Sequence, residues 1–144
     1  MNLVRPLQVG DKPMWLVLAK GYKAFYETSV TDAEYDAVFI NLLNNTGVHA
    51  LVVEREGQVV GFAHFLMHQT IWAPCACYLQ DLFVPLEQRG KGIARALIEA
   101  VADRARDAGA NRYYWTTKVD NATARALYDK VAEYRGFVRY DYSL

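Results

Sequence analysis

The stretch "LFVPLEQRGKGIARALIEA", residues 82–100, passes from an apolar run through a basic, glycine-spaced turn into a second apolar-striped segment. This pattern predicts a strand that Pro85 closes and a helix that begins just after the turn. The turn itself consists of Arg89, Gly90, Lys91 and Gly92. The first amides of a helix lack internal partners, and the helix dipole is positive there. A strand, a glycine turn and a helix in this order are therefore typical of an anion site.

Two common phosphate patterns do not fit this turn. The Walker pattern G-x-x-x-x-G-K-[ST] is absent, which argues against a nucleotide-dependent ATPase. The dinucleotide pattern G-x-G-x-x-G fails as well, because Arg95 stands where the third glycine is required. The turn therefore predicts a site for some other phosphorylated ligand.

Periodicity places further elements on both sides of this junction. It predicts strands at 3–7, 49–56, 58–70, 76–84, 111–119 and 137–144. It predicts helices at 12–27, 28–45, 92–110 and 121–134. Thr31 and Glu34 form a capping-box pattern at the start of the second helix. Adjacent strands in the middle and alternating elements in the second half predict an α/β (α+β) layer arrangement with a mixed sheet.

Composition limits the class of protein. The chain has 144 residues, 53% of them apolar, which suits one domain and excludes a disordered chain. Its 16 basic and 16 acidic residues cancel, which argues against a general nucleic-acid binder. No apolar run reaches the roughly 20 residues of a membrane span, and the N-terminus lacks the apolar centre of a signal peptide. We therefore expect neither nucleic acid nor membrane as a partner.

The chain has two cysteines, Cys75 and Cys77. Two residues apart, they make a poor disulfide pair and cannot form a four-ligand metal site by themselves. We expect buried, reduced thiols, no metal, and a cytoplasmic protein.

Two motifs resemble the GNAT superfamily of acetyl-CoA-dependent N-acetyltransferases. "RGKGIA", residues 89–94, resembles its pyrophosphate signature Q/R-x-x-G-x-G/A, which follows a strand and opens a long helix. "DNATARALYDK" resembles its later N-x-x-A-x-x-x-Y pattern, carried by Asn121, Ala124 and Tyr128. The order of elements agrees over 48–144, and the N-terminal helices resemble a branch that includes yeast histone and polyamine acetyltransferases.

The resemblance implies a fold and a cofactor. The fold is a mixed, mostly antiparallel sheet of about six to seven strands with about four helices, and a strand pair splayed at the cofactor site. Residues 1–144 then form a single N-acetyltransferase domain that uses acetyl-CoA. The residues implied at coenzyme A are Leu82, Phe83, Val84, Arg89, Gly90, Lys91, Gly92, Ile93, Ala94, Asn121 and Tyr128.

The reaction class that the resemblance implies is direct attack of an amine on the thioester in a ternary complex. The amine must be neutral, yet less than about 0.1% of a lysine-like amine is neutral at pH 7. Tyr128 is the implied acid for the departing thiolate. Some relatives carry a glutamate as base where Gln80 stands here, so that role does not transfer. Asp81 is the first candidate for the base, with His64 and His68 as alternatives.

The acceptor pocket is less determined by the sequence. The expected substrate residues are Tyr22, Tyr26, Glu27 and Gln80. Aromatic rings with a carboxylate suit a small cationic amine, such as an amino acid or a polyamine. The helical spacing of Trp15, Tyr22 and Tyr26 is equally typical of a core-facing stripe.

Alternatives remain open at this point. The acceptor could be a protein lysine or an N-terminal amine, and a neutral chain does not exclude a basic peptide. A coenzyme A-binding sensor module without turnover is a further alternative. The aromatic segment 137–144 is expected to form an edge strand through which two copies pair as a homodimer.

Overall fold

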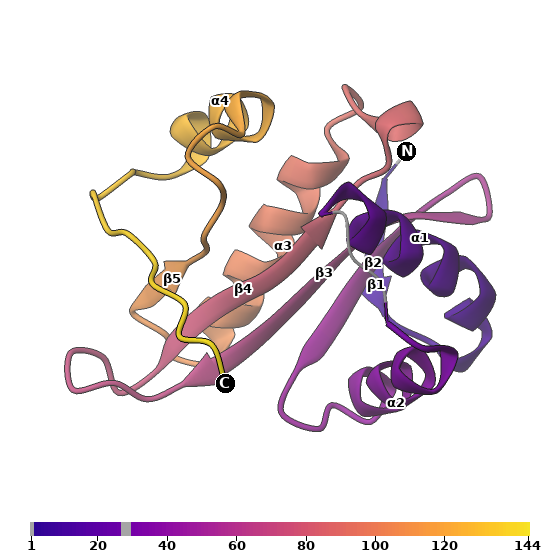
Figure 1. Ribbon diagram of the computed structural model, residues 1–144, viewed down its shortest axis with the longest axis horizontal. Helices are drawn as coiled ribbons and strands as arrows, with labels where there is room; N and C mark the ends of the chain where they lie inside the picture. The colour runs from indigo at the N-terminus through magenta and orange to yellow at the C-terminus, as the bar shows by residue number, and fades with distance from the viewer. Residues whose placement is uncertain (1, 27–29) are drawn as a thin grey trace.

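The computed structural model describes residues 2–26 and 30–144 (Figure 1). Its strands are β1 (Leu3–Pro6), β2 (His49–Arg55), β3 (Gln58–His68), β4 (Ala76–Phe83) and β5 (Arg112–Tyr114). Its helices are α1 (Lys12–Phe25), α2 (Asp32–Leu43), α3 (Ile93–Asp107) and α4 (Ala122–Val131). Two short 3₁₀ turns, η1 (Val9–Asp11) and η2 (Leu86–Gln88), lead into α1 and follow β4.

The strands form one mixed sheet in the order β1-β2-β3-β4-β5. The first four strands are antiparallel neighbours, and β5 pairs with β4 in parallel. The tight turn between β2 and β3 uses Glu56 and Gly57, both with positive φ (51° and 75°). Short links between β2, β3 and β4 produce the antiparallel meander, whereas α3 makes the crossover that a parallel neighbour requires. The predicted fold class is confirmed.

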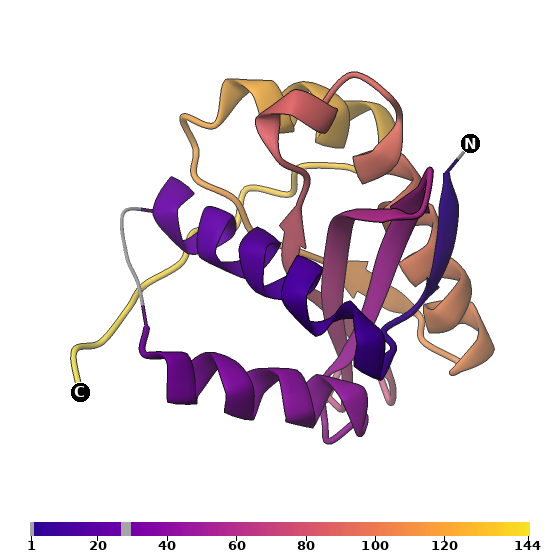
Figure 2. The ribbon, with the colours of Figure 1, turned by 90° about the vertical axis from the view of Figure 1, so that its right-hand side faces the viewer.

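Helices cover both faces of the sheet. α1 and α2 lie against one face and α3 lies against the other (Figure 2). The core therefore has two parts, one centred on Trp15, Phe39 and Phe62, the other on Leu97 and Val101. The predicted capping box of α2 is present: the Glu34 amide donates to Thr31 Oγ1 (3.2 Å), and the Thr31 amide donates to the Glu34 carboxylate (2.8 Å).

The register of β4 changes at Gln80. His64 of β3 faces Asp81, but the next residue, Phe65, faces Leu79, so Gln80 is the extra residue of a β-bulge. On its other side β4 pairs with β5 only through Ala76, Cys77 and Tyr78. Beyond Tyr78 the two strands separate, which confirms the expected splayed pair.

The strand count is lower than expected. The described sheet has five strands, not six or seven, and 137–144 forms no strand in it. The expected strand 111–119 is reduced to Arg112–Tyr114. Alternating aromatic residues predict strand-forming capacity, but a strand exists only where a partner edge completes its hydrogen bonds. Here Phe137, Tyr140 and Tyr142 remain largely exposed to solvent.

The two thiols are free and differ in environment. Cys77 is buried, and burial raises the pKa of its thiol to about 11, whereas Cys75 is only half-buried. The prediction of buried thiols is therefore right for Cys77 and too strong for Cys75.

Within the ranges that the structure describes, every helix is too short or too polar to cross a membrane.

Candidate active site

The glycine turn between β4 and α3 has the backbone geometry of an anion site. Gly90 and Gly92 both adopt positive φ (78° and 76°), a region that favours glycine. Gly92 is the N-cap of α3, and no side chain caps this helix. The first internal hydrogen bond is donated by the Ala96 amide to the Gly92 carbonyl (3.0 Å). The amides before Ala96 are therefore available to a ligand.

Arg89 holds this turn in place. Its Nε donates a hydrogen bond to the Val84 carbonyl (3.1 Å), and its guanidinium lies over the Phe25 ring of α1 (5.8 Å to the ring centroid). One Arg89 N–H group thus stabilises the loop, and the guanidinium charge remains beside the glycine turn.

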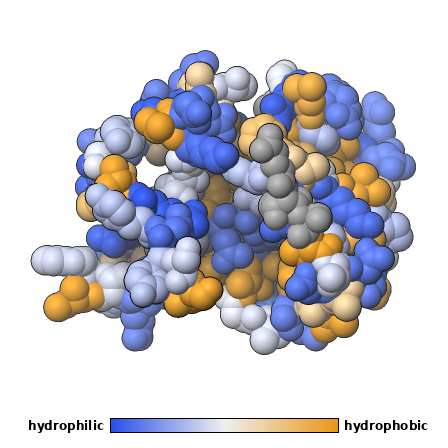
Figure 3. All heavy atoms as spheres, viewed as in Figure 1, coloured by the Kyte–Doolittle hydropathy of each residue, from blue (hydrophilic) through white to orange (hydrophobic). Residues whose placement is uncertain are grey.

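A cavity of about 350 Å³ lies in front of the turn, between α1, β4 and α4. In the space-filling view the surface is hollowed between the α1 side and the α4 side (Figure 3). The residues expected at coenzyme A all line this cavity except Lys91. Lys91 is exposed, and its Nζ donates to Gln88 Oε1 (3.0 Å).

The sequence analysis missed several residues that line the same cavity. They are Phe25, Gln88, Arg95, Thr123, Ala124 and Leu127. Arg95 could have been found, because it lies in the first turn of α3, where its charge adds to that of the amides. Thr123 could have been inferred from its position in the first turn of α4. Phe25 required knowledge of how α1 packs.

The edge of β4 faces this cavity. Beyond Tyr78 no β5 residue pairs with it, so the backbone groups of 79–83 that point away from β3 have no strand partner among the described residues. An extended chain could hydrogen-bond to them as an added strand would.

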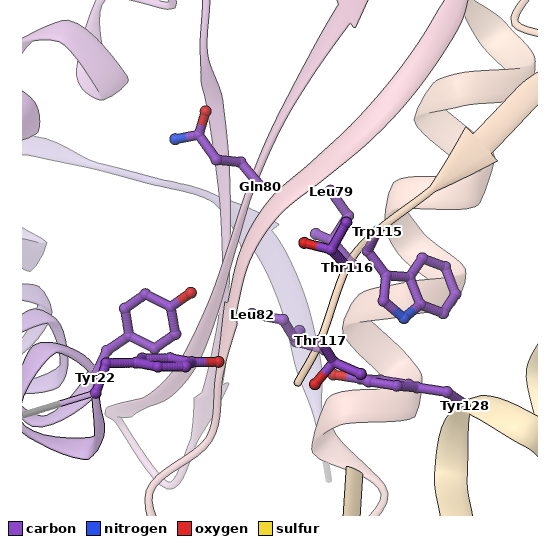
Figure 4. A pocket seen from close by; sticks show the side chains of 9 residues that line it. Tyr22, Leu79, Gln80, Leu82, Trp115, Thr116, Thr117 and Tyr128 are labelled. Atoms are coloured by element: carbon purple, nitrogen blue, oxygen red, sulfur yellow. The ribbon is translucent and has the colours of Figure 1, made fainter. Parts of the chain in front are cut away.

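A second, smaller pocket of about 30 Å³ adjoins the first (Figure 4). Its lining combines α1, the bulge of β4, the segment after β5, and α4: Tyr22, Tyr26, Leu79, Gln80, Leu82, Trp115, Thr116, Thr117 and Tyr128. Four of these, Tyr22, Tyr26, Leu82 and Tyr128, also line the large cavity. The two cavities therefore meet beside Leu82, between tyrosines of α1 and α4.

Tyr128 is positioned by the start of α4. Asn121 caps this helix: its Oδ1 accepts from the Ala124 amide (3.4 Å), and its Nδ2 donates to Thr117 Oγ1 (3.2 Å). The Tyr128 ring packs edge-on against Trp115, with centroids 5.3 Å apart. Burial raises the pKa of the Tyr128 hydroxyl above its usual value of 10.0, so it carries its proton at neutral pH.

Asp81 lies behind the wall of the small pocket, since it lines neither cavity. Its Oδ2 accepts hydrogen bonds from His64 Nδ1 (2.9 Å) and from Gln80 Nε2 (3.4 Å). Burial alone would raise the pKa of Asp81, but the hydrogen bonds from His64 and Gln80, with the nearby Tyr22 hydroxyl, hold it below its usual value of 3.8. Asp81 is therefore a carboxylate at neutral pH.

The remaining predicted residues separate into four groups. Tyr22, Tyr26 and Gln80 line the small pocket. His68 lies near the far end of β3, where its Nε2 contacts the Tyr114 hydroxyl (2.6 Å), so the structure does not bring it to the pocket. Glu27 lies outside the described residues. Trp15, of the same helical stripe as Tyr22 and Tyr26, is a core residue with 1% of its surface exposed.

Trp115, Thr116 and Thr117 were not predicted to line the pocket. They directly follow β5, and their only sequence signal was membership of a strand expected to run to Val119. Lys118 continues this segment, and its Nζ lies over the Tyr26 ring (5.5 Å to the ring centroid). The segment thus places a positive charge beside the small pocket.

Comparison with known proteins agrees with this geometry. The sequence model of the acetyltransferase (GNAT) family matches residues 15–134. The D-amino-acid N-acetyltransferase HPA3 of Saccharomyces cerevisiae is 35% identical over 135 residues, which covers 90% of this chain and 83% of that protein. A thialysine N-epsilon-acetyltransferase of Caenorhabditis elegans is 30% identical over 89 residues, covering 62% of this chain and 56% of its own length.

Solved structures share the fold. A complex of AAC(6')-Iy with the bisubstrate analogue CoA-S-monomethyl-acetylneamine superposes with a TM-score of 0.88 at 17% identity, covering 100% of this chain and 99% of that one. At this identity the likeness concerns the fold alone. The family match covers most of the chain, so the chain belongs to the acetyltransferase (GNAT) family and is an acyltransferase.

Proposed function

We propose that this GNAT-family chain transfers the acetyl group of acetyl-CoA to the primary amine of a small molecule, with amino acids as the first class to test. The observation that carries the proposal is the meeting of two cavities, one large and one small, beside Leu82, Tyr22 and Tyr128. A long donor in the first and a compact acceptor in the second would place their reacting atoms at this junction.

The large cavity fits coenzyme A in three respects. The uncapped amides of α3, with Arg89 and Arg95, suit the pyrophosphate. The open edge of β4 suits the amide groups of the pantetheine arm. Asn121 and Thr123 at the start of α4 close the cavity from the other side.

The chemistry divides between the two walls of the junction. Acetyl-CoA supplies an activated acetyl thioester. The amine nitrogen bonds to the acetyl carbon, the carbon–sulfur bond breaks, and nitrogen loses a proton while sulfur gains one. Tyr128, protonated because its pKa is raised, donates a hydrogen bond to the sulfur as negative charge develops there.

Asp81 is the group to which we assign the proton from nitrogen. A carboxylate whose pKa is lowered below its usual 3.8 is a weak base toward an ammonium of pKa about 10.4. Asp81 therefore attracts the cationic amine first. It takes up the proton, through the Tyr22 hydroxyl, only as the carbon–nitrogen bond makes the nitrogen more acidic.

The acceptor class is supported by the lining, the charge and the relatives. The small pocket has aromatic walls, and the Asp81 charge lies close to them. Lys118 at its edge would pair with a carboxylate. The related yeast protein acts, by its name, on D-amino acids, and the nematode protein on thialysine.

A thiol-release screen tests this function. The purified chain is incubated with acetyl-CoA and D- and L-amino acids, polyamines or lysine peptides. Turnover with amino acids is expected. Preferential turnover of the peptides would instead indicate that the acceptor is a protein amine. Acetyl-CoA binding without turnover of any amine would indicate a sensor module instead, and absence of acetyl-CoA binding by calorimetry would overturn the proposal entirely.

We also propose a cytoplasmic homodimer. The free thiols support a reducing compartment. The exposed aromatic segment 137–144 and the short strand β5 support pairing between copies, because each offers backbone groups that a second copy could complete. Light scattering should give twice the chain mass, and a monomeric mass at working concentration would refute the dimer.

A further inference from the structure

A buried polar chain crosses the sheet behind the small pocket. Trp15 Nε1 of α1 lies 3.2 Å from His64 Nε2 of β3, and His64 Nδ1 lies 2.9 Å from Asp81 Oδ2 of β4. Trp15 and His64 are 1% and 5% exposed. Polar contacts this deep cost stability unless each group is paired, and here both ring nitrogens of His64 have partners.

The chemistry of these partners determines which ring nitrogen of His64 carries the proton. An indole N–H can only donate, so His64 Nε2 must be an unprotonated acceptor. The proton of the neutral ring then resides on Nδ1 and is donated to Asp81. The ring is also held flat against Phe62, with centroids 4.3 Å apart and planes within 1°. His64 is therefore a fixed donor, which argues against it as the catalytic base.

The series of polar contacts from Trp15 through His64 to Asp81 reaches two residues of the acceptor pocket. A carboxylate can only accept hydrogen bonds, so Gln80 must turn its Nε2 amide group toward Asp81 (3.4 Å). The Tyr22 side chain extends from α1 toward β4 (Figure 4), and its hydroxyl lies near enough to this carboxylate to help lower the pKa of Asp81. Both residues line the small pocket. With its side-chain NH₂ group engaged by Asp81, Gln80 retains its carbonyl oxygen as a hydrogen-bond acceptor.

We propose that Trp15 and His64 are positioning residues that act through Asp81, orienting Gln80 so that it offers its oxygen lone pairs to the acceptor amine. The inference rests on the proposed function, because it names the wall that receives the amine. It deepens that function because a pocket wall that presents hydrogen-bond acceptors selects an acceptor group rich in N–H donors. It also gives Gln80 a task that a glutamine can perform and that requires no proton transfer.

The test compares Trp15→Phe with a matched core variant. Trp15→Phe keeps a ring but removes the N–H, so His64 can change tautomer and Asp81 loses its fixed donor. Phe39→Leu alters the ring that packs against Trp15 (centroids 5.3 Å apart) without touching the polar chain. We expect Trp15→Phe to raise the KM of the amine about fivefold, the effect of one lost hydrogen bond, with acetyl-CoA affinity unchanged. Phe39→Leu should lower Tm but leave the KM of the amine unchanged.

NMR spectroscopy tests the contacts between Trp15, His64 and Asp81 independently of enzyme turnover. In histidine-labelled protein, ¹⁵N NMR should show His64 protonated at Nδ1 in the wild type and a changed tautomer ratio in Trp15→Phe. An Nε2-protonated His64 in the wild type would overturn the proposal, as would an equal rise in KM for both core variants. If the wild type shows the expected tautomer but acetylates no amine, the proposed function fails, and with it the role toward the amine, while the hydrogen-bond chain stands.

Discussion

The proposed coenzyme end and the proposed acceptor end of the site are built from different parts of the chain. The coenzyme end uses backbone groups of one continuous segment, from the open edge of β4 through the glycine turn to the first amides of α3. The acceptor end uses side chains brought together from α1, β3, β4, the segment after β5, and α4. A backbone site should tolerate side-chain changes and fail when Cβ atoms are added, whereas a side-chain site should respond to single polar deletions.

The largest effect is expected where the two ends meet. Tyr128→Phe removes the hydroxyl that we assign to the departing sulfur and leaves the ring packed on Trp115. We expect kcat to fall about 100-fold, within the range for a lost acid or hydrogen-bond donor, while the Kd of acetyl-CoA stays within about twofold. Steady-state kinetics and calorimetry measure the two constants. An unchanged kcat would remove Tyr128 from the chemistry.

Asp81→Asn should follow in size, because it removes the charge behind the acceptor wall. We expect kcat/KM for the amine to fall about 30-fold, toward the lower end of the general-base range. Since the pKa of Asp81 is held below 3.8, the wild-type enzyme should show no loss from Asp81 protonation above about pH 5. A pH profile of the variant decides the role: an acidic limb and plateau identical to those of the wild type would exclude Asp81.

A Cβ at Gly92 tests the backbone end. Gly92 and Gly109 open and follow the same helix with nearly equal φ (76° and 79°), and an added Cβ at either meets no atom within 4 Å. Gly92→Ala and Gly109→Ala should therefore lose similar stability, about 1–2 kcal/mol of unfolding free energy. Only Gly92→Ala should also weaken acetyl-CoA binding, by about tenfold, or about 1.4 kcal/mol. Equal Kd values for the two variants would argue against the amide site.

Arg95→Gln should have a smaller effect, since its charge only supplements the amides. We expect the Kd of acetyl-CoA to rise about threefold at low salt, less at high salt, with kcat unchanged. Arg104→Gln, in the last turn of the same helix, is the matched control. A salt-independent change, or an equal change in the control, would show that Arg95 does not face the phosphates.

The smallest effect on activity is expected at the Arg5–Asp11 pair, which serves neither end. Arg5 donates two hydrogen bonds to Asp11 (2.8 and 2.9 Å), and the Gln8 amide donates a third (2.8 Å). The hydrogen bond from Arg5 outweighs burial and lowers the pKa of Asp11 below 3.8. Its stabilisation is therefore present above that pH and is lost as pH falls through the lower, folded-state value.

Asp11→Asn should accordingly reduce the free energy of unfolding by about 1–3 kcal/mol at pH 7, with kcat and both KM values unchanged. Its Tm should also depend less on pH below about 4 than that of the wild type. A change in the KM of either substrate would show that η1 influences the site.

The two ends also differ in how far sequence could predict them. The glycine turn, the N-cap of α4 and Tyr128 are local patterns, because Gly90, Gly92 and Asn121 determine the backbone of their immediate neighbours. Trp15 appeared as a core residue and His64 as a candidate base. Only the structure joins them to Asp81, since 49 and 17 residues separate the bonded pairs.

The sequence alone determined the order of the elements, the α/β class and the glycine turn between β4 and α3, all of which follow from periodicity and from short-range backbone preferences. Tertiary structure decided the rest. It excluded 137–144 from the sheet, where no partner edge completes its hydrogen bonds, and moved Lys91 out of the cavity. It also made Gln80 a bulge residue whose side-chain NH₂ group donates to the partly buried Asp81 carboxylate. These outcomes depend on contacts between distant segments, which sequence patterns do not specify.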